Sequence, residues 1–209
     1  MQLLFDFGGV IVDLQRDACL SAFDALGFDL RPYLGTFQQG GVFALLENGD
    51  ISVADFCQEI RHLAQQPQLA DAQIIAAWEA YLQGIPRERL ARLRNIRRHY
   101  PTHVLSNTNP IHWSQSLRLW FEHDGYDIHH YFDQLFLSYE LHLQKPDPRI
   151  FHHVVEQLGG SASDILFLDD SPENCQVARD CGLQAIVAPA QGAWYHLFDD
   201  NGKLLSPAF

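Results

Sequence analysis

The chain has 209 residues, of which 14 are lysine or arginine and 26 are aspartate or glutamate, so its formal net charge is −12. Hydrophobic residues make up 47% and charged residues 19%, a balance typical of a globular protein and not of a disordered one. Because nucleic acids and anionic membranes bind proteins through basic patches, this charge argues against both as partners.

The chain begins with a predicted strand over residues 3–7, an apolar run that contains Asp6. Residues 14–85 contain no convincing strand, and helical patterns lie at 17–26, 52–64 and 71–82. An all-helical block of about 70 residues is too long for a simple crossover between strands. We therefore predict an inserted α-helical cap domain over residues 15–85.

Strands and helices alternate from residue 86 onward. Short apolar runs, typical of strands buried on both faces, lie at 104–105, 135–137, 165–168 and 184–188. Helical patterns lie at 87–99, 148–158 and 172–181. This alternation predicts an open α/β fold with a parallel sheet, built from residues 1–14 and 86–209.

Carboxylates lie at the predicted ends of two strands, where open α/β sheets bind their ligands. Asp6 stands in an apolar run, which favours a paired or metal-bound carboxylate, or else one that caps the following turn. Asp169 and Asp170 are adjacent, and because their charges repel, a bound cation would stabilise them. Alternatively, this segment only caps the next helix, with Ser171 as the N-cap, and both interpretations can hold together.

Two further segments carry candidate ligand-binding groups. Lys145 stands in a loop stiffened by Pro146 and Pro148, an unusual place for a lysine that only needs solvent, although a surface charge is the alternative. It is one of only two lysines in the chain. Ser106 and Asn107 follow a predicted strand and precede a helix start at Pro110, which suits an anion.

In order and spacing, four segments resemble the four motifs of the haloacid dehalogenase superfamily. They are 5–10 (Phe-Asp-Phe-Gly-Gly-Val), 105–109 (Leu-Ser-Asn-Thr-Asn), 145–148 (Lys-Pro-Asp-Pro) and 167–171 (Phe-Leu-Asp-Asp-Ser). The helical insertion lies where the family's cap 1 domain lies, so the resemblance covers nearly the whole chain. The first motif also resembles that of the glucose-1-phosphatase-like phosphatases.

The resemblance implies a Rossmann-like core and a Mg²⁺-dependent phosphatase of a small phosphorylated metabolite, a sugar phosphate or a nucleotide. Asp6 would attack phosphorus and form an aspartyl phosphate, which water then hydrolyses. Asp6, the carbonyl group of Gly8 and Asp170 would bind the Mg²⁺.

The remaining motif residues would orient and neutralise the reacting groups. Asp169 would orient waters or Lys145, and Lys145 would neutralise charge on both the phosphate and the nucleophile. Ser106, Asn107 and backbone N–H groups near Gly9 would hold the phosphoryl oxygens.

The sequence departs from the family pattern at two positions. Most phosphatases of this superfamily carry a second aspartate two residues after the nucleophile, where this chain has Gly8. A backbone carbonyl keeps the metal role, but the general acid–base role, which typically contributes about 10²–10⁴ in rate, is lost. The second departure is His142, which stands where relatives have glycine and is expected at the mouth of the pocket.

Two other functions remain open at this point. A 2-haloacid dehalogenase attacks carbon without a metal, and its relatives also lack the second aspartate, but the pair Asp169 and Asp170 argues against it. A non-catalytic binding protein with the same fold is the other alternative. The clustered charges of Asp6, Asp170 and Lys145 argue against a site without catalytic activity.

The other features have structural interpretations. The 11 histidines show no zinc spacing, and the arginines at 87–98 are expected on a solvated helix face paired with acidic neighbours. Phe43, Phe56, Trp78 and Tyr81 are expected in the core of the cap, where one or two of them could line the substrate pocket, and His112 is expected at the cleft rim. The four cysteines form no C-x-x-C pair and no apolar run is long enough to span a membrane, so we expect reduced thiols in a cytoplasmic protein, a monomer or a homodimer.

Overall fold

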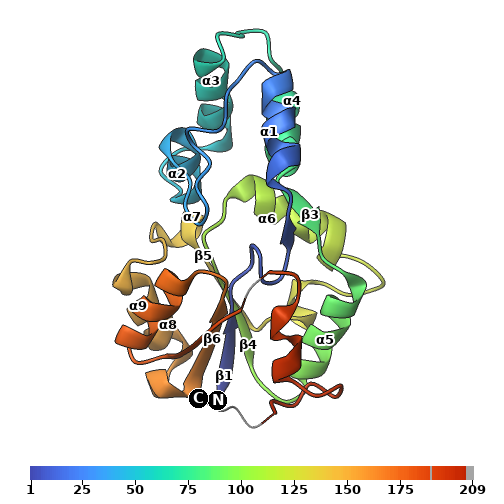
Figure 1. The fold of residues 1–209 in the computed structure, drawn as a ribbon, viewed down its shortest axis with the longest axis vertical. Helices are drawn as coiled ribbons and strands as arrows, with labels where there is room; N and C mark the ends of the chain where they lie inside the picture. Colours follow the sequence, from blue (N-terminus) through green and yellow to red (C-terminus); the bar gives the residue numbers. More distant parts are fainter. Residues whose placement is uncertain (189, 206–209) are drawn as a thin grey trace.

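A five-stranded parallel sheet forms the centre of the computed structural model, which describes residues 1–188 and 190–205 (Figure 1). The strand order is β5-β4-β1-β6-β7, and every pairing is parallel. The strands are β1 (Gln2–Phe5), β4 (Thr102–Ser106), β5 (Gln134–Leu137), β6 (Ile165–Asp169) and β7 (Gln184–Val187). The chain starts in the middle and winds to both sides, which confirms the predicted Rossmann-like α/β fold.

The polar residues at the strand ends are held within the sheet pairing itself. All five residues of β4 and all five of β6 are buried, so these strands end with Ser106 and Asp169 still inside the sheet. Asp6 follows β1, and its N–H donates to the carbonyl of Leu168 at 2.8 Å. The parallel register therefore carries these three side chains to one edge of the sheet.

Helices cover both faces of the sheet because its apolar side chains alternate in direction. Leu4 packs with Ile150 and Phe151 of α8 (Pro148–Leu158), whereas its neighbour Leu3 belongs to the core on the other face, with Leu93 of α5 (Arg87–Arg97). Each of these side chains is 0% exposed, and such burial stabilises by about 1.5–3 kcal/mol per side chain. No helix in the described part of the chain is both long and apolar enough to cross a membrane.

Three core helices start directly after the site loops, and each has proline in its first turn. They are α6 (Pro110–Ser116), α8 and α9 (Pro172–Asp180). Their N-cap side chains accept hydrogen bonds from backbone N–H groups of the first turn, and these caps are Asn109, Asp147 and Ser171. Proline suits this position because its missing N–H has no helical partner to lose. The caps therefore fix where the loops that carry the motif residues end.

The cap forms a helical lobe above the carboxyl edge of the sheet (Figure 1). Its helices are α1 (Arg16–Ala25), α2 (Gly41–Glu47), α3 (Val53–Leu63) and α4 (Asp71–Glu79). Phe43, Phe56 and Trp78 are 0% exposed, and the ring of Phe43 lies 4.8 Å from Trp78 and 5.1 Å from Phe56, edge to face. These aromatic side chains form the predicted core of the cap.

The cap is joined to the core by a short ribbon that the sequence does not predict. β2 (Asp13–Leu14) and β3 (Leu82–Gly84) pair antiparallel, so the prediction that residues 14–85 contain no strand is wrong. Strands of two and three residues are too short to show a hydrophobic pattern of their own. The ribbon lies beside the predicted boundaries at residues 15 and 85, and the exact division into domains stays a prediction.

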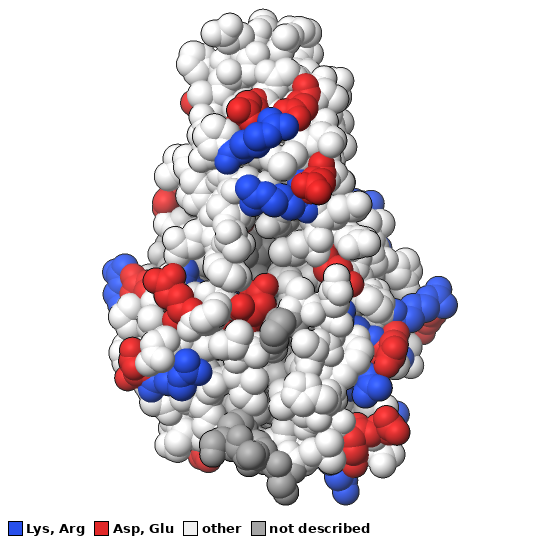
Figure 2. Space-filling view, in the orientation of Figure 1, with Lys and Arg blue, Asp and Glu red and all other residues white. Residues whose placement is uncertain are grey.

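The arginine-rich helix α5 only partly follows its prediction. Arg92 pairs with Glu88 at 2.9 Å and Arg97 with Asp133 at 2.6 Å, and the face in Figure 2 shows basic and acidic side chains lying side by side. Arg89, in contrast, is 1% exposed and pairs with Asp13 of β2 at 2.8 Å. Arg89 also donates to the carbonyl of Ile11 at 2.8 Å, so it ties the first motif loop to α5 instead of facing solvent.

Candidate active site

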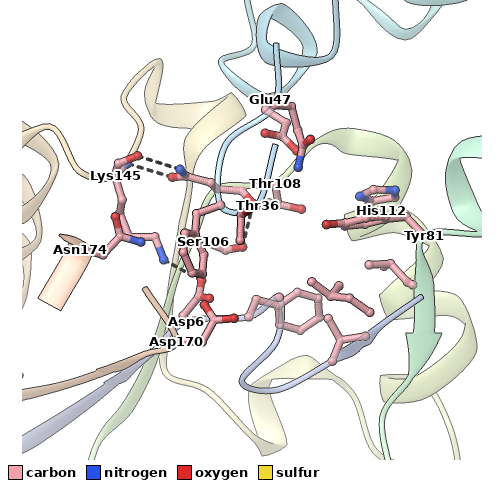
Figure 3. Close-up of a pocket in the computed structure, with 18 residues that line it drawn as sticks. Asp6, Thr36, Glu47, Tyr81, Ser106, Thr108, His112, Lys145, Asp170 and Asn174 are labelled. Atoms are coloured by element: carbon pink, nitrogen blue, oxygen red, sulfur yellow. Dashed lines mark hydrogen bonds and ion pairs between the residues drawn. The ribbon is translucent and has the colours of Figure 1, made fainter. Parts of the chain in front are cut away.

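A cavity lies between the carboxyl edge of the sheet and the cap (Figure 3). The core and the cap both contribute polar side chains to it. From the core come Asp6, Ser106, Thr108, His112, Lys145, Asp170 and Asn174, and from the cap come Thr36, Gln39, Glu47 and Tyr81. The structure therefore brings the four predicted motifs together in one place.

Lys145 forms a buried bridge between two aspartates. Its Nζ lies 2.6 Å from Oδ1 of Asp6 and 2.6 Å from Oδ2 of Asp169, and all three residues are less than a tenth exposed. Burial pushes the pKa of Lys145 down, but the charges of Asp169 and Asp6 push it further up, so the ammonium group stays protonated. Lys145 is therefore a fixed cation inside the site and not a surface charge.

Asp169 binds the ammonium group of Lys145 and is itself fixed by other hydrogen bonds. Its Oδ1 accepts a hydrogen bond from the N–H of Ser171 at 2.7 Å, and both of its oxygens accept from Nδ2 of Asn174 at 3.1 Å. Ser171 in turn caps α9. Because its oxygens already have these partners, Asp169 is suited to orient the ammonium group, as the resemblance implies.

Asp170 faces the cavity with its carboxylate available. No described side chain donates a hydrogen bond to it or forms an ion pair with it. Burial raises its pKa to about 6, and the neighbouring charge of Asp169 adds to this shift while Lys145 opposes it. A carboxylate that is held near other negative charges without a cation of its own is a candidate metal ligand.

The carboxylate cluster has the composition of a hard-cation site. Oxygen atoms of Asp6, Asp169 and Asp170 all lie within 4.8 Å of one another. Burial raises the pKa of Asp6 to about 8 although Lys145 opposes the shift, and both other aspartates add to it. A divalent cation would offset this accumulated negative charge and keep Asp6 ionised, and carboxylate oxygens are the ligands that Mg²⁺ prefers.

Glycine is required at position 9 by both conformation and space. Gly9 has a φ of +82°, and a Cβ built on it would lie 2.2 Å from Oδ2 of Asp170. The Gly9 N–H itself donates to the carbonyl of Val12 at 2.8 Å, so the binding of phosphoryl oxygens by backbone N–H groups near Gly9 stays a prediction for the neighbouring residues. At Gly8, by comparison, an added Cβ would only touch Leu14 at 3.8 Å. The structure therefore has room at position 8 for the Cβ of the aspartate that most phosphatases of the superfamily carry there.

The two residues of the second motif have different environments. Ser106 is 1% exposed and lines the cavity, and its contact with a phosphate stays a prediction. The side chain of Asn107 is already occupied: its Nδ2 donates to the Lys145 carbonyl and its Oδ1 accepts from the Lys145 N–H, each at 2.8 Å. The side-chain amide therefore fixes the lysine loop, and because Asn107 also lines the cavity, its contact with phosphoryl oxygens stays a prediction.

His142 lies away from the catalytic cavity. Its Nδ1 is 3.0 Å from the carbonyl oxygen of Asn48, at the end of α2, so it contacts the cap from the core. Its backbone is left-handed, with a φ of 53°, which explains why glycine would suit this position. The role of His142 at the mouth of the cavity stays a prediction.

Sequence reasoning missed the functional candidates on the cap side. Gln39 and Glu47 line the cavity. Glu47 ends α2, which has only 7 residues and starts at Gly41 after the N-cap Gly40, so the sequence shows no helical pattern there. Tyr81 also lines the cavity, in agreement with the expectation that one or two of the cap aromatics do so. His112 is 5% exposed and stacks on Trp78 with ring centroids 4.5 Å apart, so it is buried and not at the rim. Burial lowers the pKa of His112 to about 4, which makes its ring neutral.

Known proteins resemble this chain along most of its length. Residues 2–182 match the haloacid dehalogenase-like hydrolase family. A D-ribitol-5-phosphate phosphatase of Bacteroides thetaiotaomicron is 33% identical over 192 residues, which cover 91% of this chain and 92% of that protein.

Solved structures give the same picture. A haloacid dehalogenase-family enzyme from Bacteroides thetaiotaomicron, crystallised with magnesium and inorganic phosphate, is 37% identical with a TM-score of 0.89, covering 95% of this chain and 98% of that one. A predicted hydrolase of the same family from Porphyromonas gingivalis is 27% identical with a TM-score of 0.84, covering 92% and 93%. With four motifs converging on one cavity and similarity over nearly its whole length, this chain belongs to the haloacid dehalogenase-like hydrolase family.

Proposed function

We propose that this protein is a Mg²⁺-dependent phosphatase that hydrolyses a small phosphorylated metabolite through an aspartyl phosphate on Asp6. The observation that carries the proposal is the buried bridge of Lys145 to Asp6 and Asp169, beside the available carboxylate of Asp170. The similar D-ribitol-5-phosphate phosphatase, and the similar enzyme crystallised with magnesium and phosphate, support this chemistry. They favour a sugar or polyol phosphate over a nucleotide.

Asp6 is positioned to act as a nucleophile. Lys145 holds its Oδ1, and no described side chain donates to its Oδ2, so one oxygen fixes the orientation of the carboxylate while the other can react. Attack forms a bond from an Asp6 oxygen to phosphorus and breaks the ester P–O bond, and the leaving oxygen takes up a proton from water. Water then hydrolyses the acyl phosphate, which releases phosphate and restores Asp6.

The positive charge needed for this attack comes from two sources. A carboxylate approaches a phosphate dianion only where cations offset their repulsion. Lys145 supplies one fixed charge. Asp6, the carbonyl group of Gly8 and Asp170 would hold Mg²⁺, which would supply the second charge and polarise the phosphoryl oxygens.

A phosphate-release assay on a panel of metabolite phosphates tests the proposal. Wild-type protein is expected to release phosphate with Mg²⁺ and to lose this activity in EDTA, and Asp6→Asn is expected to be inactive in both. Asp164→Asn, an exposed aspartate far from the cavity, serves as the matched control and should retain activity. Equal hydrolysis with and without metal would refute the mechanism.

The two alternative functions predict different results in the same experiments. A 2-haloacid dehalogenase would release halide in EDTA, and a binding protein would turn over no phosphate ester. The structure offers no specific observation for either, since Asp170 is left available beside Asp6 and Lys145. We also propose a cytoplasmic location, supported by four cysteines that are all free.

A further inference from the structure

Glu47 is a buried carboxyl group on the cap side of the catalytic cavity. It is the last residue of α2 and is 7% exposed, and Figure 3 shows it across the cavity from Asp6 and Asp170. Its backbone carbonyl accepts a hydrogen bond from Oγ of Ser138 at 2.5 Å, which ties this end of α2 to the core. The proposed phosphatase chemistry gives this carboxyl group no role.

The surroundings of Glu47 favour its neutral form. Burial raises its pKa to about 8, and a hydrogen bond from Asn109 only partly opposes the shift. Within the described residues, no lysine, arginine or histidine forms an ion pair with it. A protonated carboxyl group presents an O–H donor together with an acceptor oxygen, so near neutral pH Glu47 is a hydrogen-bonding group without charge.

An unpartnered acceptor lies in the same cavity wall. Oε1 of Gln39 is buried and has no hydrogen-bond partner in the described structure. Gln39 lines the same cavity as Glu47. A buried acceptor without a partner costs free energy, so a ligand that donates a hydrogen bond to Oε1 of Gln39 would recover this cost.

The charges along the cavity restrict what the leaving group can be. Lys145 is the one cationic side chain among the described residues that line it, and Asp6 and Asp169 already engage its Nζ. The ring of His112 is neutral. A second phosphate or a carboxylate on the leaving group would therefore find no cation of its own on the cap side. An alkyl group would leave the Gln39 oxygen unpaired.

We propose that Glu47 and Gln39 bind hydroxyl groups of the leaving group, so that the enzyme selects monophosphates of uncharged polyols or sugars. A hydroxyl group both donates and accepts, and so it matches the donor of Glu47 and the free acceptor of Gln39. This inference rests on the proposed phosphatase function and names the class of substrate for the same site.

Steady-state kinetics on two matched esters test the inference. The probes are a pentitol 5-phosphate and n-pentyl phosphate, which have the same chain length and differ in their hydroxyl groups. For the wild type, we expect kcat/KM to favour the pentitol ester by at least about a hundredfold, because a site built to bind hydroxyl groups rejects analogues that lack them. If neither ester nor any other phosphate is hydrolysed, the proposed function fails; if both are hydrolysed equally, only this inference fails.

Two variants of Glu47 separate binding from chemistry. Glu47→Ala is expected to lower the preference for the pentitol ester about tenfold, chiefly through KM, whereas Glu47→Gln, which keeps a neutral donor, should stay within about threefold of wild type. Glu59→Gln, on the exposed side of α3, is the matched control and should leave the preference unchanged. A fall in kcat on both esters with unchanged KM would overturn the inference.

The pH dependence of this preference is a second readout. As Glu47 ionises above about pH 8, the wild-type preference for the pentitol ester should fall, while that of Glu47→Gln should not. Two titratable groups facing Glu47 do not change over this range, because burial raises the pKa of Tyr81 to about 12 and lowers that of His112 to about 4. Across the cavity, the pKa of Asp170 is raised to about 6, so Asp170 is already ionised, whereas the pKa of Asp6 is raised to about 8 and lies in the same range. Titration of Asp6 affects both esters and cancels in their ratio. A preference that changes equally with pH in wild type and Glu47→Gln would overturn the inference.

Discussion

Removing the buried cation Lys145 is expected to destabilise the fold as well as abolish activity. Lys145 is 2% exposed and lies 2.6 Å from both Asp6 and Asp169. Lys145→Met keeps a chain of similar length but leaves the buried carboxyl groups of Asp6 and Asp169 without their cation. Breaking a buried ion pair by removing one partner costs about 3–5 kcal/mol. Because one ammonium group serves both aspartates, we expect one such loss and not two.

The loss is large against the stability of an ordinary domain, which is about 5–15 kcal/mol. Urea unfolding in EDTA, followed by circular dichroism, measures it without a contribution from bound metal. Lys203→Met is the matched control: Lys203 is the other lysine of the chain, and its side chain is exposed. This control should change the free energy of unfolding by less than about 0.5 kcal/mol.

A second substitution tests whether unpaired charge is the cause. Adding Asp169→Asn to Lys145→Met removes the carboxylate of Asp169, which has lost its cation, and is expected to recover part of the lost stability. The reasoning is refuted if Lys145→Met is as stable as wild type, or if the double variant is no more stable than the single one.

Four further outcomes follow from particular contacts. Gly9→Ala should weaken Mg²⁺ binding in a calorimetric titration, because its Cβ would lie 2.2 Å from Oδ2 of Asp170, whereas Gly125→Ala, with a similar φ of +78° and nothing within 4 Å, should not. Asp170→Asn should lower Mg²⁺ affinity and leave the metal-free melting temperature unchanged or higher, because it removes a like charge. Arg89→Leu should lower the free energy of unfolding by about 3–5 kcal/mol in urea titrations, since it leaves Asp13 without its partner. Finally, the folded-state pKa of Glu47, raised by burial to about 8, exceeds its usual 4.5, so the folded form retains a proton that the unfolded form releases. Between these two values, rising pH should therefore destabilise wild type relative to Glu47→Gln in unfolding experiments.

The sequence predicts which polar residues meet at one edge of the sheet because parallel strands bring their carboxyl ends together. Asp6, Ser106, Asp169 and Asp170 each follow or end an apolar strand, and the carboxyl ends of parallel strands meet at one edge. Lys145 has no such strand position, and the resemblance to the four motifs located it. Both routes depend on local patterns that a single sequence displays.

The remaining parts of the site depend on tertiary contacts that leave no local pattern. Nothing in the second motif indicates that the amide of Asn107 is used up by the backbone of Lys145, 38 residues away. Arg89 belongs to a charged helix, and only the packed structure shows that it reaches Ile11 and Asp13. Glu47 closes a short helix that begins with glycines, and its burial follows from docking of the cap. Such contacts are set by how the lobes pack, so the structure is needed to find them.

The charge of the cavity connects the reaction with the choice of substrate. Asp6, Asp170 and Glu47 line a space with one cationic side chain, and a phosphate dianion must enter it. If all three carboxyl groups were ionised, the phosphate would be repelled from the core side and from the cap side together. A bound divalent cation relieves the repulsion at Asp6 and Asp170, but it cannot serve the far side of the cavity, where Glu47 lies. Protonation of Glu47 relieves it there without adding a cation, and it leaves the cap side polar and uncharged. In this way the burial that keeps Glu47 neutral favours a leaving group with hydroxyl groups and disfavours one that carries a second charge.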